Sequence, residues 1–497
     1  MMSQISASSR VSVWTFFPPL LLLLGAAWAI RGVSETDVYW HILMGQDILL
    51  HLRLTGDPSW VFGPGDDTWQ TTQWVSEVAL YLAYDSLGWL GIVILRLLLL
   101  LGLAVSLYFA IRAAVSPSLR GSKLNMVVTL IGIPLLMASP FMAMERPQAV
   151  SLILLPWIGL YALRLLYTGQ WPRWWAIGLL CVVWAWFHGA VLIVAPILAG
   201  AFFVRCTVLR VKPTIRTLRE GLLVIAAVAI APALGPLGFG YYRQAYLIQQ
   251  ASSEVILEWL PSKTTEIAFI SWVALLALWA FGSLKSWRAT AGRIPKPIVL
   301  EGVWLLLLLG LSLVAYRYIP VAILIAAPLI ARRLALSLAS RPVPKPLLPR
   351  WWVVALICFA SALTITGAWP TLSNVNPVRE GSPERAWAAL RDAQGERRVL
   401  VFYNISGATL IMTRPGVSVG IDGRTDRYGD LIPKYLELAS GKYGWQDTFT
   451  DYADATDALI LKESALREHL IEMGWTLMCE DGDYAWLSAP GISGSCT

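Results

Sequence analysis

The sequence predicts an α-helical polytopic membrane protein of about eleven transmembrane helices with a C-terminal extracytoplasmic α/β domain. The first observation is composition: 57% of the 497 residues are hydrophobic, only 14% are charged, and the mean hydropathy is +0.60. These values lie far outside the range of soluble globular proteins. The second observation is that apolar runs alternate with short basic loops. The third is that residues 371–497 lose this pattern.

Each predicted span is an apolar run close to the length that crosses a bilayer, which is about 20 residues for a helix. These runs are residues 14–30, 89–110, 126–144, 150–167, 174–187, 190–204, 222–237, 267–281, 299–315, 319–330 and 352–368. We therefore expect about eleven crossings of the membrane.

Positive charge in the loops orients these spans, because cytoplasmic loops collect Lys and Arg. If the N-terminus with Arg10 is cytoplasmic, the cytoplasmic loops carry residues such as Arg112, Arg205, Arg210 and Lys212 and almost no acids. The net charge of +7 therefore indicates topology. Nucleic-acid binding is excluded because the basic residues are dispersed over short loops.

Two domains follow from this organisation. Residues 1–370 form the transmembrane domain, which includes a long first outside loop at 34–88, and residues 371–497 form the extracytoplasmic domain. The segment 370–377 between them is rich in Pro, Ser and Asn, as expected of a boundary. An odd number of spans places the tail on the same side as the first loop.

The tail alternates short β-rich runs with helical patterns, which predicts an α/β domain. The predicted strands are 398–403, 417–421, 458–461, 477–480 and 484–488, and the predicted helices are 383–393, 431–439 and 464–473. Cys479 and Cys496 also lie in the tail. The sequence leaves open whether they pair, because a disulfide requires an oxidising compartment.

An acidic turn follows the first span directly. Glu35 and Asp37 precede an amphipathic segment, residues 39–50, that contains Trp40 and His41. Carboxylates at a membrane surface are costly unless they are used, and a helix lying in the interface would hold them against the bilayer. Asp37 and His41 stand one helical turn apart, which suits a hydrogen-bonded pair or a shared divalent metal ion, but two residues do not define a metal site. We expect Asp37, with Glu35 and His41 beside it, to form the catalytic centre.

Polar residues at other predicted outside turns form a second group. Arg146 and Arg317 are candidates to hold a lipid phosphate or pyrophosphate, because a guanidinium group offers paired donors and stays charged. The alternative is a snorkelling side chain or an ion pair, which for Arg146 could involve Glu145. His188 could contact a substrate oxygen, hold a metal or be structural, and Glu258 adds a carboxylate to this group.

The first loop combines aromatic rings with carboxylates. Aromatic faces stack on sugars and carboxylates accept from sugar hydroxyls, so the loop is compatible with a saccharide site made of Trp40, Asp66, Asp67 and Trp74. Tryptophan also anchors proteins at the membrane surface, and the chain has 25 tryptophans.

The tail has one dense polar motif, residues 421–430, at the exit of the predicted strand 417–421. Loops at the carboxyl ends of strands carry ligand contacts in α/β domains. Asp422, Arg424 and Asp426 are therefore candidate substrate contacts. A charged turn that caps the following helix is the alternative.

Motifs of several other enzyme classes are missing from the sequence. It contains neither a Walker loop nor a Rossmann GxGxxG, so ATP-driven and nicotinamide chemistry have no support. It also lacks GxSxG and HExxH. Catalysis would therefore depend on carboxylates.

On these residues the chain resembles the GT-C class of integral-membrane glycosyltransferases, which use polyprenyl-phosphate-linked sugars. The resemblance rests on Glu35-Thr-Asp37 after the first span, the amphipathic segment 39–50, the long first loop, the many spans and the outside C-terminal domain. The chain is also similar to uncharacterised bacterial membrane proteins related to this class. They carry patterns like Asp37-Val-Tyr-Trp-His41, Arg146-Pro-Gln, His188-Gly and Ile421-Asp-Gly-Arg424.

The resemblance implies a GT-C-like protein of the bacterial plasma membrane that transfers a hexose or pentose, with inversion, from a polyprenyl-phosphate-linked sugar. The acceptor would be an extracytoplasmic glycan, lipid or protein. Asp37 would act as base or metal ligand with Glu35 as its partner, and a divalent metal ion is an open cofactor. The tail lacks the WWD-type signature of oligosaccharyltransferases, which disfavours transfer to peptide asparagine.

Two other functions stay open. A transporter or flippase of a lipid-linked saccharide would place its site near the bilayer midplane, whereas the polar residues gather here at one surface. A noncatalytic envelope-assembly protein would use the outer domain to bind a partner. The sequence specifies neither the sugar nor the acceptor nor the oligomeric state.

Overall fold

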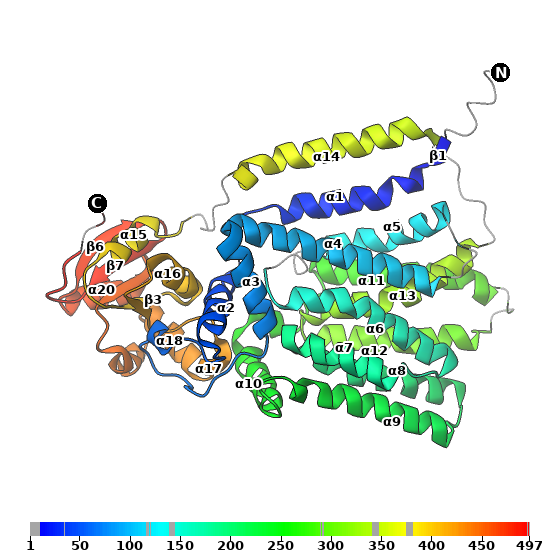
Figure 1. Cartoon of the computed structure of the whole chain (residues 1–497), viewed down its shortest axis with the longest axis horizontal. Coiled ribbons are helices and arrows are strands. Elements are labelled where there is room, and N and C mark those ends of the chain that lie inside the picture. The colour runs from blue at the N-terminus through cyan, green and yellow to red at the C-terminus, as the bar shows by residue number, and fades with distance from the viewer. Residues whose placement is uncertain are drawn as a thin grey trace. The chain divides into compact units, whose positions relative to one another are not determined.

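The computed structural model describes residues 10–33, 35–115, 119, 121–138, 145–288, 290, 293–339, 347–373, 381–494 and 496. The chain forms two compact units (Figure 1). Unit 1 is Met1–Arg31, Val93–Pro236 and Glu258–Asn374, and unit 2 is Gly32–Ile92, Leu237–Leu257 and Val375–Thr497. Unit 2 therefore gathers the first loop, the tail and a segment between two spans. The last part of the predicted span 126–144, from residue 139, and the linker from residue 374 lie outside the described residues.

Unit 1 is a bundle of apolar helices that run alongside one another (Figure 1). Among the described residues, seven helical segments are long and apolar enough to cross a membrane: Trp89–Ala114 (α4), Gln148–Thr168 (α6), Gly189–Leu209 (η4 and α8), Ile215–Leu234 (α9 and η5), Ile267–Arg288 (α11), Lys296–Val314 (α12) and Tyr318–Leu338 (α13). Four shorter apolar segments are Val13–Ala29 (η1 and α1), Ser122–Met137 (α5), Trp174–Phe187 (α7) and Val354–Gly367, which lies within α14 (Arg350–Ser373). Each overlaps one predicted span, and the predicted polytopic helical fold is confirmed.

Helix α13 is the centre of this bundle. It packs against α5, α6, α11 and α12, and almost every residue from Ile319 to Ala335 is buried. Gly159 of α6 makes a close approach to α13 possible, since a β-carbon there would lie 2.3 Å from the carbonyl oxygen of Ile325. Small residues at helix crossings are typical of membrane bundles.

A buried ion pair joins α12 and α13. Arg333 donates to Glu301 through Nε (2.7 Å) and Nη2 (2.6 Å), and Glu301 also accepts from Trp279 Nε1 (2.7 Å) and from the hydroxyl of Tyr167. A charge inside a bundle is stable only with such partners. Glu301 and Arg333 therefore satisfy each other and stabilise the bundle.

Unit 2 contains a five-stranded mixed sheet with the order β4-β3-β5-β7-β6. Its strands are Arg397–Val401 (β3), Val417–Val419 (β4), Asp457–Leu461 (β5), Thr476–Asp481 (β6) and Tyr484–Ser488 (β7). β3 runs parallel to both β4 and β5, and β7 is antiparallel to β5 and β6. All five strands coincide with predicted ones within a few residues.

Helices surround this sheet. Glu384–Asp392 (α15), Leu431–Ser440 (α18) and Ala465–Glu472 (α20) correspond to the three predicted helices. Three more were not predicted in the tail: Ser406–Thr413 (α16), Thr425–Tyr428 (α17) and Trp445–Phe449 (α19). Unit 2 also contains Val38–His51 (α2), Trp74–Leu87 (α3) and Gly240–Val255 (α10), which come from outside the tail.

The first loop pairs with the edge of the tail sheet. Val61 forms a parallel bridge with Val419 of β4, and Phe62 N donates to Val419 O (3.1 Å). The next residue, Gly63, leaves room for this contact, since a β-carbon there would lie 2.3 Å from Gly420 O and 2.2 Å from the Tyr452 ring. The loop thereby covers a strand edge that would otherwise be exposed.

Helix α2 corrects the expectation of an amphipathic helix with one exposed face. Every residue from Val38 to Gly45 is buried, including His41 at 3% exposure. The physical reason is that α3 and α16 both pack against α2, so its polar positions face protein. Gly45 allows the contact with α3, since a β-carbon there would lie 2.1 Å from Glu77 O.

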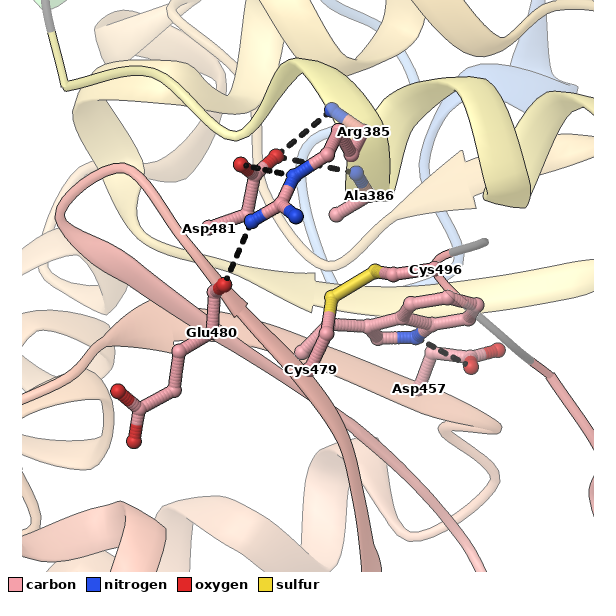
Figure 2. The surroundings of a disulfide bond; sticks show 8 residues. Arg385, Ala386, Asp457, Cys479, Glu480, Asp481 and Cys496 are labelled. Carbon is pink, nitrogen blue, oxygen red and sulfur yellow. Dashed lines mark hydrogen bonds and ion pairs between the residues drawn. A yellow bond between two sulfur atoms is a disulfide. The ribbon is translucent and has the colours of Figure 1, made fainter.

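A disulfide fixes the C-terminal end of the chain to the sheet. Cys479 of β6 bonds to Cys496 (Figure 2), so the pairing that the sequence left open is made. Nearby, Asp457 accepts from Trp486 Nε1 at 2.9 Å and from Ser488 Oγ at 2.6 Å. Asp481 accepts from the backbone N–H of Arg385 (2.7 Å) in the first turn of α15, where a carboxylate is favourable.

Candidate functional site

Asp37 stands at the start of α2 but does not cap it. It occupies the position before the first helical residue, where an aspartate usually accepts from the first turn of the helix, yet its side chain makes no such bond. Its carbonyl oxygen accepts from His41 N at 3.2 Å. Asp37 as a residue is half-buried, and its carboxylate is not used to cap the helix.

Two glycines of the tail seat the turn that carries Asp37. A β-carbon on Gly407, in α16, would lie 3.2 Å from Tyr39 Cβ and 3.4 Å from Thr36 O. A β-carbon on Gly423 would lie 2.5 Å from Trp40 Cδ1 and 3.2 Å from Asp37 Oδ1. The acidic turn of the first loop and the motif 421–430 of the tail therefore meet at Gly423.

Trp40 lies with its ring edge on Gly423. The side chain is only 6% exposed, so its ring is part of the interior of unit 2. The buried Nε1 atom has no hydrogen-bond partner among the described residues. A buried donor without a partner costs about 1–3 kcal/mol of stability.

Tyr403 brings a hydroxyl group to the same place. It is the second residue after β3, and its hydroxyl lies 3.2 Å from Thr425 Oγ1. Burial raises the pKa of the Tyr403 phenol, and the negative charge of Asp37 raises this pKa further. Tyr403 and Gly423 follow parallel neighbouring strands, so Asp37 faces the carboxyl ends of β3 and β4, where α/β domains bind ligands.

A buried hydrogen-bond network holds His41. Its Nδ1 lies 3.1 Å from Glu77 Oε1, and that oxygen also accepts from Thr71 Oγ1 at 2.9 Å. Glu77 is completely buried, and its Oε2 has no hydrogen-bond partner among the described residues. Burial raises the pKa of Glu77 to about 8 against the bond from Thr71, so this carboxyl group keeps its proton at neutral pH.

Asp422 and Arg424 form an internal pair. Neither side chain is exposed, and Arg424 Nη2 lies 2.6 Å from Asp422 Oδ2. The Arg424 guanidinium also lies 5.3 Å from the ring of Trp60 and 5.1 Å from that of Trp69, and donates to Thr55 O at 3.1 Å. Burial opposes ionisation of Asp422, but the charge of Arg424 holds the pKa of Asp422 below its ordinary value. The observed contacts of these two residues are thus within the protein, and they fix the motif against the first loop.

Asp426 joins three separate segments of unit 2. It accepts from Trp69 Nε1 of the first loop at 2.6 Å and from Gln244 Nε2 of α10. Burial raises its pKa to about 6, against the lowering effect of both hydrogen bonds. Asp426 therefore contacts the first loop, α10 and the tail.

The other predicted residues of the first loop have local roles. Asp66 accepts from Thr68 N (2.8 Å) and Oγ1 (2.6 Å), which forms a turn. Asp67 pairs with Arg427 at 3.2 Å. Trp74 is the first residue of α3, and Glu35 is buried beside the Asp37 turn at 7% exposure.

Unit 1 holds the predicted arginines around Glu258. Arg146 Nη1 donates to Glu258 Oε1 at 2.9 Å, and Arg317 N donates to the backbone oxygen of Glu258 at 3.0 Å. The Arg317 guanidinium lies over the Trp259 ring at 4.3 Å. Burial lowers the pKa of Arg317, and the charge of Arg146 acts in the same direction. The Glu258 carboxylate thus pairs with Arg146, and its charge also acts on Arg317.

Glu145 and His188 have partners within unit 1. Glu145 pairs with Arg96 of α4, not with its neighbour Arg146. Ala190 N donates to His188 Nδ1 at 3.2 Å, so this nitrogen accepts, and Ser151 Oγ, at 2.8 Å, donates to it. His188 therefore caps η4 through Nδ1.

A metal site requires several ligating side chains close together. Among the described residues, no group of three or more His, Cys, Asp or Glu side chains could hold an ion. Near Asp37, the Nδ1 atom of His41 faces Glu77. A bound divalent ion stays an expectation from the sequence.

The structure places ten predicted site residues in unit 2: Glu35, Asp37, Trp40, His41, Asp66, Asp67, Trp74, Asp422, Arg424 and Asp426. The other four, Arg146, His188, Glu258 and Arg317, lie in unit 1. The prediction did not include Tyr403, Gly423 or Gln244. Tyr403 ends a predicted strand and Gly423 lies in the motif, so position after a strand could have identified both. Gln244 lies in a polar helix without any signal of its own.

Comparisons with known proteins show the fold. No protein-family model and no curated protein matches the chain. ArnT from Cupriavidus metallidurans is similar in structure: the apo form has a TM-score of 0.51 and 12% identity over 96% of this chain and 97% of that chain. The form bound to undecaprenyl phosphate has a TM-score of 0.50 and 10% identity over 97% of this chain and 98% of that chain. An oligosaccharyltransferase of Archaeoglobus fulgidus, tethered with an acceptor peptide containing the NVT sequon, has a TM-score of 0.50 and 12% identity. The match covers 89% of this chain and 69% of that chain.

These similarities span nearly the whole chain at very low identity. The chain therefore has the fold of GT-C glycosyltransferases and is an integral membrane protein, as the resemblance predicted.

Proposed function

We propose that the protein is a membrane glycosyltransferase that moves a sugar from a polyprenyl-phosphate donor to an extracytoplasmic acceptor. The observation that carries this proposal is the position of Asp37, which does not cap its helix and faces Gly423 at the carboxyl ends of β3 and β4. The GT-C fold supports it, because ArnT of that fold was solved with undecaprenyl phosphate bound.

The proposed reaction needs a base and a stabilised leaving group. Asp37 takes the proton of the acceptor hydroxyl, and the acceptor oxygen attacks the anomeric carbon of the donor sugar. The bond between that carbon and the phosphate oxygen breaks, and polyprenyl phosphate leaves with the bonding electrons. A single displacement of this kind inverts the anomeric centre.

The arginines of unit 1 are proposed to bind the donor phosphate. Arg146 pairs with Glu258, and the charges of Arg146 and Glu258 both act on Arg317. Arg146 and Arg317 also stand at the starts of α6 and α13, neither of which has a side-chain cap. The N–H groups of a helix start favour an anion, and a guanidinium group adds paired donors.

Unit 2 is proposed to be extracytoplasmic. Disulfides persist outside the cytoplasm, and Cys479 pairs with Cys496 in the tail. The basic residues of the predicted cytoplasmic loops support the same orientation.

The test uses purified protein in lipid nanodiscs with a panel of polyprenyl-phosphate-linked sugars. Mass spectrometry should detect released polyprenyl phosphate, and Asp37→Asn should lower the rate by roughly 10²- to 10⁴-fold with unchanged thermal stability. Asp447→Asn, at an exposed position of α19, is the matched control. Full activity in a folded Asp37→Asn protein would remove Asp37 from the reaction. Movement of the lipid across the bilayer without release of polyprenyl phosphate would favour a flippase.

A further inference from the structure

We infer that Arg205 and Arg332, near the ends of α8 and α13, bind the headgroup phosphate of an anionic phospholipid beside the end of α6. This inference does not depend on the proposed reaction. Arg146 and Arg317 precede the starts of α6 and α13, whereas the lipid site lies toward the ends of these helices. In the proposed orientation it faces the cytoplasmic leaflet of the membrane.

Tyr167, in the last turn of α6, brings the two arginines together. Helix α6 packs against both α8 and α13. Arg205 of α8 donates through Nη1 to the carbonyl oxygens of Leu166 (2.9 Å) and Tyr167 (2.7 Å). The guanidinium of Arg332, in α13, lies 4.3 Å from the centre of the Tyr167 ring. Both guanidinium groups therefore contact the same residue.

Neither Arg205 nor Arg332 forms an ion pair within the described part of the chain. Glu301 also contacts Tyr167, but both of its oxygens accept from Arg333, at 2.6 and 2.7 Å. The face of the Tyr167 ring stabilises the cation of Arg332 without neutralising it. The two positive charges are therefore not compensated by a carboxylate of these helices.

Both arginines lie inside helical segments of membrane length. Arg205 belongs to the segment 189–209 and Arg332 to the segment 318–338. Arg332 precedes the end of its segment by nearly two helical turns. A charge within a membrane span is costly, so it usually pairs with a counter-charge or marks a functional site. A counter-charge from outside the chain would meet this need.

The unused donor atoms of both arginines are accessible. Each of the two side chains is half-buried. Protein encloses Nε of Arg332, whereas its two Nη atoms are not enclosed and have no hydrogen-bond partner among the described residues. Arg205 uses only Nη1, so its Nε and Nη2 are also available. N–H groups of two guanidiniums are thus open to a ligand at the surface of the bundle.

The chemistry and the depth of these groups select the ligand. A guanidinium group presents paired donors that match the oxygens of a phosphate. Trp174 and Trp175, just after the loop that follows α6, are 51% and 54% exposed. Because tryptophan gathers at the membrane surface, they place this end of α6 at the level of the lipid headgroups. Basic sites between helices on the cytoplasmic side bind anionic headgroups.

The first test counts lipids bound to the purified protein by native mass spectrometry. One molecule of phosphatidylglycerol should bind more tightly than phosphatidylcholine with the same acyl chains, because the choline cation offsets the phosphate charge. Arg332→Gln should weaken binding of phosphatidylglycerol roughly tenfold to hundredfold, as expected for a hydrogen bond between charged groups. Arg332→Lys should recover part of this loss. Arg219→Gln, at an exposed position of α9, is the matched control and should change binding less than about fivefold.

Three results would overturn the site. Equal binding of the two phospholipids, or equal losses in Arg332→Gln and Arg219→Gln, would leave only a general effect of surface charge. Displacement of phosphatidylglycerol by an equal concentration of inorganic phosphate would assign the arginines to a free anion. Tighter binding of undecaprenyl phosphate, lost in Arg332→Gln, would assign them to the proposed donor lipid.

A second measurement uses the wild-type protein, in case Arg332→Gln does not fold. Photoreactive phosphatidylglycerol in nanodiscs should label peptides from residues 161–175, 202–212 or 326–339, and labelling confined to other peptides would overturn the site. Binding of phosphatidylglycerol that depends on Arg332, in a protein that releases no polyprenyl phosphate from any donor, would support the lipid site and refute only the glycosyltransferase proposal.

Discussion

Replacing Glu77 by glutamine should make the stability of the protein less dependent on pH. Glu77 is completely buried and shares its Oε1 with Thr71 and His41. Burial raises its pKa from 4.5 to about 8. The folded protein therefore holds a proton on Glu77 that the unfolded chain releases across this interval.

The sign and size of the effect follow from linkage. The favourable contribution of protonated Glu77 is complete below pH 4.5 and is lost as the pH rises to about 8. The free energy of unfolding should fall by about 1.4 kcal/mol per pH unit within this window. The whole interval corresponds to about 5 kcal/mol as an upper estimate, from the same pKa values. Glutamine does not ionise, so Glu77→Gln lacks this slope.

The assay compares chemical unfolding of detergent-solubilised wild type and Glu77→Gln from pH 5 to pH 9, followed by tryptophan fluorescence. The variant buries an amide NH₂ in place of Oε2, which adds a constant cost of about 1–3 kcal/mol. The readout is therefore the slope against pH and not the offset. Glu472→Gln, the same substitution at an exposed position of α20, controls for the loss of a carboxyl group.

One result would refute this reasoning. If Glu77 were ionised and paired with a charged His41, Glu77→Gln would be less stable than wild type. The difference between their free energies of unfolding would then not shift in favour of the variant between pH 5 and pH 8. A pH-independent difference would equally show that Glu77 does not keep a proton at neutral pH.

Three further outcomes are expected. Arg146→Ala and Arg317→Ala should each weaken donor binding by about 2 to 5 kcal/mol, and Arg317→Lys should recover part of it. Glu258→Gln should retain donor binding because both guanidinium groups remain. Near-normal affinity in both alanine variants would exclude a phosphate role. Tyr443→Cys, at a fully exposed position of the tail, should react with an impermeant thiol reagent in intact cells that otherwise lack reactive cysteines, and labelling only after lysis would reverse the orientation. Gly407→Ala should lower turnover without changing donor affinity, because its β-carbon would lie 3.2 Å from Tyr39 Cβ. Gly310→Ala, at a position with open space around it, should have no effect. Equal activity of the two variants would argue against positioning of Asp37 by the tail.

The helices and strands of the chain were largely predictable because their signals are local. An apolar run of membrane length or a short β-branched segment is visible within one window of sequence. Helix α3 was not predicted because Trp74–Leu87 lies within the predicted outside loop 34–88. Helix α10 was not predicted because its residues, which include Arg243 and Gln244, are too polar for a membrane span.

The candidate site was predictable in its parts and not in its assembly. The motifs around Asp37 and Asp422 each stood out in the sequence, but their meeting at Gly423 joins residues almost four hundred positions apart, and no local pattern encodes such a contact. Arg424 shows the same limit, because the sequence indicates a charge at a strand end but not that Asp422 and two tryptophan rings enclose it.

The burial of α2 changes what holds the acidic turn. An interfacial helix would fix Asp37 through the bilayer, so its position would depend on lipid composition. The structure instead fixes α2 through α3 and α16, with His41 held by Glu77 and Trp40 held by Gly423. The carboxylate that the proposed reaction needs is therefore positioned by the tail and the first loop together. A tail that was disordered or displaced would leave Asp37 in the chain but would remove Gly423, Tyr403 and Thr425 from around it, so the folded tail belongs to the proposed active site.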